Sequence, residues 1–255
     1  MPSVIYKEYA PHPALAEWIK TYWHFSTHTD NIPNFDIIPD GYFDLLLIFK
    51  DGNLIDTCLT GIWDKMISVS YESNMDVIGI RFMPIVLHTP IIGSIASFVN
   101  SSSGIELSEF QLETSQFELY IRSSIKIILQ YLNVKFCKLF SEISVNSSLK
   151  GLYQTIENSQ GTVSIAKLSE LTGYSTRHIH RISKASLGIA AKDYTNIVRF
   201  RETLLAEKRN NKDFIGYFDQ SHFIKNFKRI TGTTPNNLNI STDVRFLQYC
   251  NQFNP

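Results

Sequence analysis

The spacing of hydrophobic and polar residues predicts strands in the first third of the chain. Five short apolar or alternating runs occur there, as expected when successive side chains point to opposite faces of a sheet. Turn formers such as Pro39-Asp40-Gly41 and Asp51-Gly52-Asn53 separate them. The runs are Phe35–Ile38, Phe43–Phe49, Leu54–Gly61, Met66–Tyr71 and Val77–Phe82. We therefore predict a mostly antiparallel sheet or small barrel.

Helical spacing occurs on both sides of these strands. Before them, Pro11–Phe25 begins with proline turns and continues with apolar residues spaced as in one short amphipathic helix. After them, a broad apolar stripe runs from Phe117 to Phe140 and is too wide for a solvated helix. We expect it to pack on the strands, on a neighbouring helix or on a second subunit. The polar stretch Ser144–Ser159 predicts a domain boundary.

A helix, a tight turn and a second helix are predicted between Ser164 and Gly188. Gly173 can end the first helix because glycine accepts a positive φ, and Ser175 is a good N-cap for the second. The second helix keeps Ile179 and Ile182 for the core. The polar residues near its N-terminal end are Thr176, Arg177, His180 and Arg181. In a helix-turn-helix motif these side chains would meet base edges in a major groove.

A similar pattern lies between Tyr217 and Pro235. It begins with an aromatic residue, has Asp219 as a capping residue, and uses Phe223 and Phe227 to anchor the helix to a core. The polar residues of this helix are Gln220, Ser221, Lys225, Lys228 and Arg229. A long helix predicted over Tyr194–Leu205 would hold the two units at a fixed separation.

Composition adds an asymmetry of charge to this picture. With 255 residues, 44% of them hydrophobic and 19% charged, the chain suits two globular domains. The formal net charge is zero, but residues 1–150 carry 10 basic and 16 acidic side chains, whereas residues 151–255 carry 14 basic and 8 acidic. Such a division is typical of a DNA-binding module joined to a regulatory module, because only the former must meet phosphate.

The most specific run of the chain is Gly216–Phe223, which reads GYFDQSHF. It is supported by Phe227-Lys228, Gly232–Pro235, Gly173-Tyr174-Ser175, Arg181, Leu187-Gly188 and Arg199-Phe200-Arg201. Over about residues 160–238 these runs resemble the DNA-binding domain of the AraC/XylS transcription regulators. Such proteins insert the second helices of two helix-turn-helix units into successive major grooves. The resemblance implies that Arg177, His180 and Arg181 read one half-site and that Gln220, Ser221 and Lys225 read the next.

The N-terminal half is similar, though less specifically, to the sensing domains of one branch of this family. The similarity rests on Ile38–Gly41 before an apolar strand and on Gly79–Pro84 after another. It implies a ligand-responsive or dimerising domain. Arg81 would pair with Asp40 or Asp44, either within a turn and core or as part of a grip on a ligand.

Two departures from the family pattern bear on DNA binding. The stretch Arg199–Gly216 is about half a dozen residues shorter than in typical members, so the supporting helix of the second unit is truncated or absent. Ser183 stands where an aromatic residue is usual, which removes core area. A second hypothesis is therefore a degenerate family member that acts as a protein-interaction module with weak or no DNA binding.

Enzymatic chemistry has little support in the sequence. The chain has no nucleophile elbow, glycine-rich phosphate loop or recognisable pair of catalytic carboxylates, so we expect no enzyme, and a small-molecule hydrolase or isomerase is the weakest alternative. The cysteines and histidines lack metal-ligand spacing, so we expect reduced thiols, no metal and no cofactor. Without a secretory signal or a long apolar run, we expect a cytoplasmic protein that has no membrane partner.

These observations predict three parts. Residues 1–110 form an α+β sensing domain, residues 111–158 a helical connector that is also a candidate dimerisation element, and residues 159–255 an all-α DNA-binding domain. The expected partners are double-stranded DNA and RNA polymerase, with a small-molecule effector and a second copy of the chain as further candidates. Family membership implies a transcription activator, while the residues themselves leave the sign of regulation, the effector and the operator open.

Overall fold

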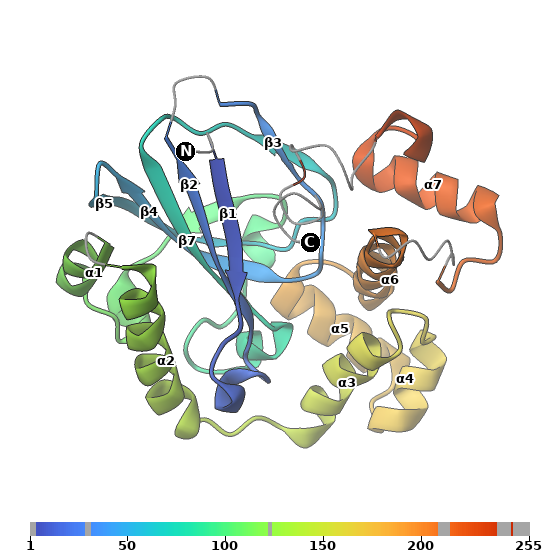
Figure 1. The fold of residues 1–255 in the computed structure, drawn as a ribbon. Coiled ribbons are helices and arrows are strands. Elements are labelled where there is room, and N and C mark those ends of the chain that lie inside the picture. Colours follow the sequence, from blue (N-terminus) through green and yellow to red (C-terminus); the bar gives the residue numbers. More distant parts are fainter. Residues whose placement is uncertain (1–3, 29–31, 122–123, 209–214, 239–245, 247–255) are drawn as a thin grey trace.

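A six-stranded antiparallel sheet forms the N-terminal part of the structure, a computed structural model that describes residues 4–28, 32–121, 124–208, 215–238 and 246 (Figure 1). The strand order is β1-β2-β7-β4-β5-β8. These strands are β1 (Val4–Tyr9), β2 (Ile19–Thr27), β4 (Phe43–Lys50), β5 (Asn53–Thr60), β7 (Met75–Phe82) and β8 (Ser102–Gly104). A separate two-stranded sheet pairs β3 (Phe35–Ile37) with β6 (Ile67–Val69).

Alternation along the strands gives the six-stranded sheet two different faces. In β7, Ile78, Ile80 and Phe82 enter the main hydrophobic core. Val77 and Arg81 point the other way, toward the β3–β6 sheet, where Val77 packs in a smaller aromatic cluster. Because the side-chain period is two residues, a charged residue at position 81 faces away from the main core without interrupting it.

Two helices, α1 (Thr114–Ile121) and α2 (Ile125–Ser141), lie on the side of the main core (Figure 1). Phe136 of α2 contacts Phe82 of β7 edge to face, with ring centroids 5.7 Å apart. Phe140 stacks on Trp18 at 4.7 Å. The apolar stripe of α2 is therefore buried against the sheet of the same chain.

The first four helices that the structure describes in the C-terminal part continue the same core, and the fifth packs in a second apolar cluster with Phe200 and Leu204. In chain order these helices are α3 (Ser147–Asn158), α4 (Ile165–Thr172), α5 (Thr176–Leu187), α6 (Ala191–Lys208) and α7 (Gln220–Thr231). A single cluster of buried apolar residues runs from the sheet through α2, α3, α4 and α5 to α6. The predicted fold class, an α+β part followed by an all-α part, is confirmed. The predicted domain limits at 110 and 158 stay predictions.

Three details of the predicted secondary structure need correction. The helix predicted over Pro11–Phe25 is wrong, because β2 begins at Ile19 and only a short 3₁₀ turn, Pro13–Leu15, precedes it. The aromatic and β-branched residues of this run favour a strand, and pairing with β1 and β7 on both sides decides the outcome. The polar stretch Ser144–Ser159 contains α3, which has no counterpart among the predicted helices, and Val4–Tyr9 forms a strand that was not predicted.

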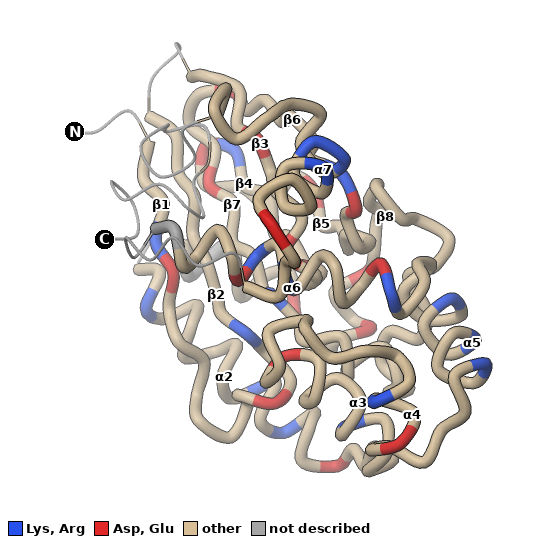
Figure 2. Tube along the Cα trace, turned by 90° about the vertical axis from the view of Figure 1, so that its right-hand side faces the viewer, with Lys and Arg blue, Asp and Glu red and all other residues tan. Residues whose placement is uncertain are grey.

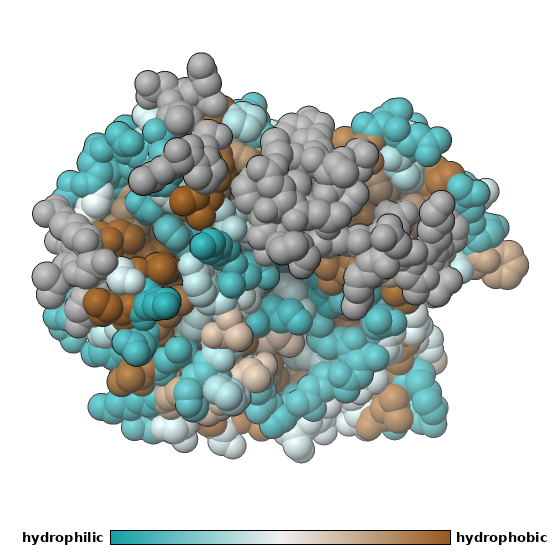
Figure 3. All heavy atoms as spheres, in the orientation of Figure 1, coloured by the Kyte–Doolittle hydropathy of each residue, from teal (hydrophilic) through white to brown (hydrophobic). Residues whose placement is uncertain are grey.

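The surface of the molecule is mixed in character. On the face shown in Figure 3, the hydrophobic residues that the structure describes lie in small groups among hydrophilic ones. Within the described ranges, none of the helices combines the length and the apolar character needed to span a bilayer.

The packing of α2 predicts a sharp difference between two positions on that helix. Phe136 is fully buried, whereas Val134 is 70% exposed. Phe136→Ala should lower the free energy of unfolding by about 3–5 kcal/mol, because it leaves a cavity between helix and sheet. Val134→Ala should change it by less than about 0.5 kcal/mol. Urea denaturation measures both, and equal costs would contradict this account of the core.

Candidate nucleic-acid interface and the network behind it

The first helix-turn-helix unit consists of α4 and α5, and its caps are the residues that the sequence indicated. The Ser164 hydroxyl accepts a hydrogen bond from the Lys167 amide at 3.1 Å at the start of α4. Gly173 ends that helix with φ at +74°. The Ser175 hydroxyl then accepts from the His178 amide at 3.2 Å and begins α5. The turn therefore fixes the direction in which α5 leaves α4.

The outward face of α5 carries the polar residues that the sequence singled out. Thr176, Arg177, His180 and Arg181 are all exposed, whereas Ile179 is fully buried. A nitrogen of the Arg181 guanidinium lies 3.0 Å from Nδ1 of His178 one turn earlier. Figure 2 shows the basic residues of α5 along the outer rim of the molecule. This face is open along the first turns of the helix.

The helix α7 repeats this arrangement. The Asp219 carboxylate caps it by accepting from the His222 amide at 2.7 Å, and Phe223, Phe227 and Ile230 are buried. The polar residues predicted to contact DNA are again exposed: Gln220, Ser221, Lys225, Lys228 and Arg229. The supporting helix that the sequence predicts to be truncated falls largely on residues 209–214, which lie outside the described residues.

The long helix α6 links the two units through Arg199. This buried guanidinium donates to the carbonyl oxygen of Gly161 at 3.1 Å and to that of Gly216 at 3.3 Å. It also lies over the ring of Tyr217, 5.5 Å from its centroid. Gly161 precedes the first unit and Gly216 precedes α7. The Arg199 side chain therefore holds the segments that lead into both units against α6.

Both α5 and α7 also contact the N-terminal part through backbone hydrogen bonds. The Ile95 amide donates to the carbonyl oxygen of Ser186 near the end of α5 at 3.1 Å. The Met66 amide donates to the carbonyl oxygen of Ile230 near the end of α7 at 2.8 Å. Ile38, which precedes the turn at Asp40, packs in the same apolar cluster as the buried side of α7.

A buried ion network joins the sheet to α6. The Arg201 guanidinium donates to the Glu157 carboxylate of α3 at 2.7 Å and to the carbonyl oxygen of Asp40 at 2.8 Å. It lies 4.6 Å from the centroid of the Tyr42 ring, and the Tyr42 hydroxyl donates to Glu157 at 3.0 Å. Burial raises the pKa of Tyr42, so this hydroxyl keeps its proton. Glu202 accepts from Arg201 at 2.9 Å.

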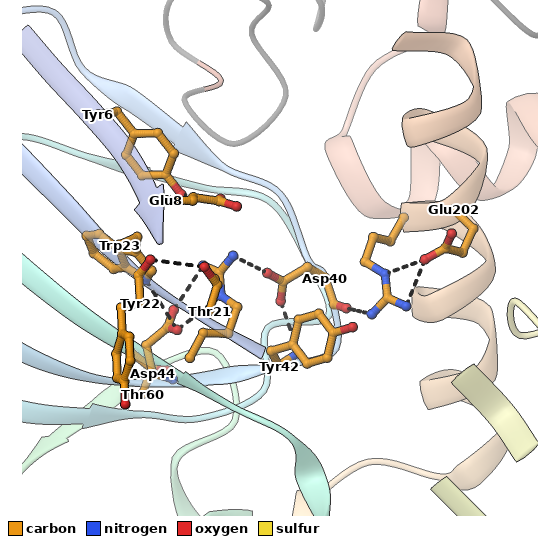
Figure 4. Close-up of polar contacts among 12 residues, drawn as sticks. Tyr6, Glu8, Thr21, Tyr22, Trp23, Asp40, Tyr42, Asp44, Thr60 and Glu202 are labelled. Carbon is orange, nitrogen blue, oxygen red and sulfur yellow. Dashed lines mark hydrogen bonds and ion pairs between the residues drawn. The ribbon is translucent and has the colours of Figure 1, made fainter. Parts of the chain in front are cut away.

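A second ion cluster lies on the sheet side of the same turn. Arg81 forms two 3.1 Å bonds with the Asp44 carboxylate, directly across the β4–β7 register, and one 3.1 Å contact with the Asp40 carboxylate. In Figure 4 the dashed lines run from Trp23 and Asp44 to Asp40 and on to the helix that carries Glu202. Burial raises the pKa of Asp40, and the Arg81 charge acts against this shift.

Some of these residues stand out in the sequence, but their arrangement does not. The sequence predicts that Arg81 pairs with Asp40 or Asp44, and in the structure Arg81 pairs with both. Arg201 is visible in the sequence only as part of a family motif, and Glu157 carries no signal there. The spacing of residues held no signal for this network, because its members come from separate parts of the chain.

Comparison with known sequence families gives one match, over residues 7–103, to a domain of unknown function, DUF6597. The match covers less than half of the chain and ends before the first helix-turn-helix unit. No curated protein matches the chain.

Comparison with solved structures finds ToxT from Vibrio cholerae. One crystal structure is 12% identical, covers 93% of this chain and 97% of that chain, and gives a TM-score of 0.45. A second, in a P21 crystal form, is also 12% identical, covers 92% and 96%, and scores 0.42. A third, 13% identical with a TM-score of 0.39 and the same coverage, has (E)-4-(8-methylnaphthalen-1-yl)but-3-enoic acid bound to ToxT. These low values support no conclusion about what this chain binds.

The ion network predicts that two basic residues of α6 differ in their effect on stability. Arg201 has a side chain only 6% exposed, whereas Lys192 is exposed. Arg201→Ala should lower the free energy of unfolding by about 3–5 kcal/mol, because Glu157, whose side chain is 15% exposed, would lose its cation in a largely buried site. Lys192→Ala should change it by less than about 0.5 kcal/mol. Chemical denaturation of both variants checks this, and a small effect of Arg201→Ala would contradict the network.

Proposed function

We propose that this chain is a non-enzymatic transcription regulator of the AraC type that binds double-stranded DNA in the cytoplasm through α5 and α7. The observation that carries the proposal is the first turn of α5. Ser175 caps this turn, Thr176, Arg177 and His180 are exposed on it, and Ile179 on the opposite side of the helix is buried in the core. A helix that enters a major groove needs such a division, with reading side chains near its N-terminal end.

The chemistry of the exposed residues supports two kinds of contact. Arg177 and Arg181 can donate two parallel hydrogen bonds to guanine, and His180 can bond to a base edge. The exposed cations of α7, Lys225, Lys228 and Arg229, fit phosphate oxygens, which hold the protein in register without reading sequence. The excess of acidic residues lies in the N-terminal part and the excess of basic residues in the part that carries α5 and α7, which supports phosphate contact by the latter.

Control by the N-terminal part follows from its contacts with both helices. The residues around Ile95 bond to the end of α5, and those around Met66 bond to the end of α7. A change in the sheet part, caused by a small-molecule effector or by a second copy of the chain, would therefore alter how the two helices are presented to DNA. RNA polymerase is the further partner that a bound activator would contact.

The proposal is tested by selecting duplexes from a random DNA library with the purified full chain. If both helices read DNA, the recovered sequences should contain two boxes about one helical turn apart, roughly 10–10.5 base pairs from centre to centre. A single recovered box would show that α7 does not read bases. Recovery of no motif, with no loss of affinity as salt rises, would contradict DNA binding and favour a protein-interaction module.

Substitutions on α5 test the reading residues individually. Arg177→Ala and Arg181→Ala should each weaken binding to the selected duplex by about 1–3 kcal/mol and relax the preference at one base position. Lys167→Ala is the matched control, because Lys167 is an exposed cation of the supporting helix α4 and pairs with Glu170 at 2.8 Å. Titration with the selected and a scrambled duplex measures all three variants. Unchanged affinity and base preference in both arginine variants would refute the assignment of α5.

A further inference from the structure

A cavity lies between the six-stranded sheet and the β3–β6 sheet. Its volume is about 210 Å³, enough for a small molecule. The floor comes from side chains of β1, β2, β4 and β7 that point away from the main core, and the opposite wall comes from Ile37, Ile67 and Val69. Gly79 helps to make this floor, because a Cβ there would lie 2.0 Å from the Trp23 indole ring. The indole therefore lies flat on the sheet at the edge of the cavity.

Among the described residues, two aspartates and one arginine are the charged residues that line the cavity. Arg81 has its Nε and Nη2 atoms bonded to Asp44 and its Nη1 atom 3.1 Å from Asp40. One of the two carboxylates is thus matched in charge by the guanidinium, which leaves one negative charge in excess. Asp40 is the less satisfied of the two, because apart from Arg81 it accepts one hydrogen bond, from the Tyr42 amide at 3.0 Å.

Other nearby cations do not supply the missing charge to the cavity. Arg201 reaches only the backbone oxygen of Asp40, and its own charge is matched by Glu157 and Glu202. Lys20 is exposed and lies over the Tyr42 ring at 5.7 Å, in an adjoining hollow that shares Asp40, Tyr42 and Arg81 with the cavity but that opens on the other side of them. Of the residues that the structure describes, Arg81 is the one cation that lines the cavity, and a cationic ligand would match the second carboxylate.

Aromatic rings make up much of the remaining lining: Tyr6, Trp23, Phe25, Tyr42, Trp63 and Tyr71. The faces of such rings attract cations, most strongly where water is excluded. The Tyr6 hydroxyl is turned to Glu8 at 2.7 Å, a further carboxylate on the same strand (Figure 4). An anion would meet the excess negative charge and an arginine whose nitrogens are already engaged, so anionic ligands are disfavoured.

From this combination we propose that the cavity binds a small organic cation, a quaternary ammonium or a substituted amine, with its charge near Asp40 and its apolar groups against the aromatic rings. Burial raises the pKa of Asp40, and a bound cation would oppose that shift. The Asp40 carboxylate faces the cavity while its carbonyl oxygen holds Arg201 of α6, so occupancy would be felt at the helix between the two DNA-binding units. The regulatory meaning of this site rests on the proposed function, but the binding itself does not.

The test is direct titration of the purified full chain, without DNA, followed by tryptophan fluorescence and calorimetry. Each cation is compared with an uncharged molecule of the same shape, choline with 3,3-dimethylbutan-1-ol and benzylamine with benzyl alcohol. At least one cation should bind about tenfold or more tightly than its uncharged counterpart. Equal binding within both pairs, binding of neither cation, or tighter binding of an uncharged counterpart would overturn the proposal.

A pair of matched variants locates the site. Asp40→Asn keeps an acceptor for the Tyr42 amide but removes the excess charge, so it should abolish the preference for the cation. Asp56→Asn, on an exposed position of β5 in the same sheet, should leave that preference unchanged. A preference that survives Asp40→Asn would place the cation elsewhere and overturn the assignment. Because no DNA is present, a cation that binds while library selection fails would refute only the proposed function.

Discussion

The fold depends most on the burial of Arg201. A guanidinium removed from water costs several kcal/mol unless its donors are satisfied and its charge is matched. Here Glu157 of α3, Glu202 of α6 and the carbonyl oxygen of Asp40 accept its hydrogen bonds, and the ring of Tyr42 covers it. These partners come from the sheet part and from two helices, so the charge is satisfied only when those parts are assembled. Among the described residues, no buried side-chain nitrogen or oxygen lacks a partner.

The burial of Arg201 connects the sheet part of the molecule to the helical part. The turn at Asp40 contacts α6 on one side through its backbone and the Arg81 cluster on the other through its carboxylate. Gly41, with φ at +84°, lets the chain approach α6 closely, since a Cβ there would lie 3.2 Å from the Tyr194 ring. The same helix carries Arg199, which holds the entry to α7. A disturbance in the cavity therefore has a short covalent and hydrogen-bonded route to α6 and to the start of α7.

Local signals in the sequence were sufficient for much of the fold. Caps such as Ser164, Ser175 and Asp219 act within one turn of the chain, and the left-handed Gly173 needs no partner far away. For the same reason the exposed face of α5 could be predicted from its own spacing. The alternation of apolar and polar residues also located most strands, since this pattern depends only on which face of the strand is buried.

The features that local signals could not predict depend on contacts between residues that are far apart in the sequence. Ile19–Thr27 has apolar residues at spacings that suit either a helix or a strand, and it becomes a strand because β1 and β7 pair with it. Arg81 and Asp44 face each other across a register that neither segment specifies alone. The Arg201 network joins residues 157, 201 and 42, so no local pattern could have revealed it.

A double-mutant cycle between Tyr42→Phe and Glu157→Gln tests this account most directly, because their 3.0 Å hydrogen bond joins the sheet part to the helical part at the Arg201 site. The free energies of unfolding of the parent, the two single variants and the double variant are measured by denaturation. The account predicts a coupling energy of about 0.5–3 kcal/mol, as found for residues in one network. Additive effects, within about 0.3–0.5 kcal/mol, would show that the two parts are not joined through this network.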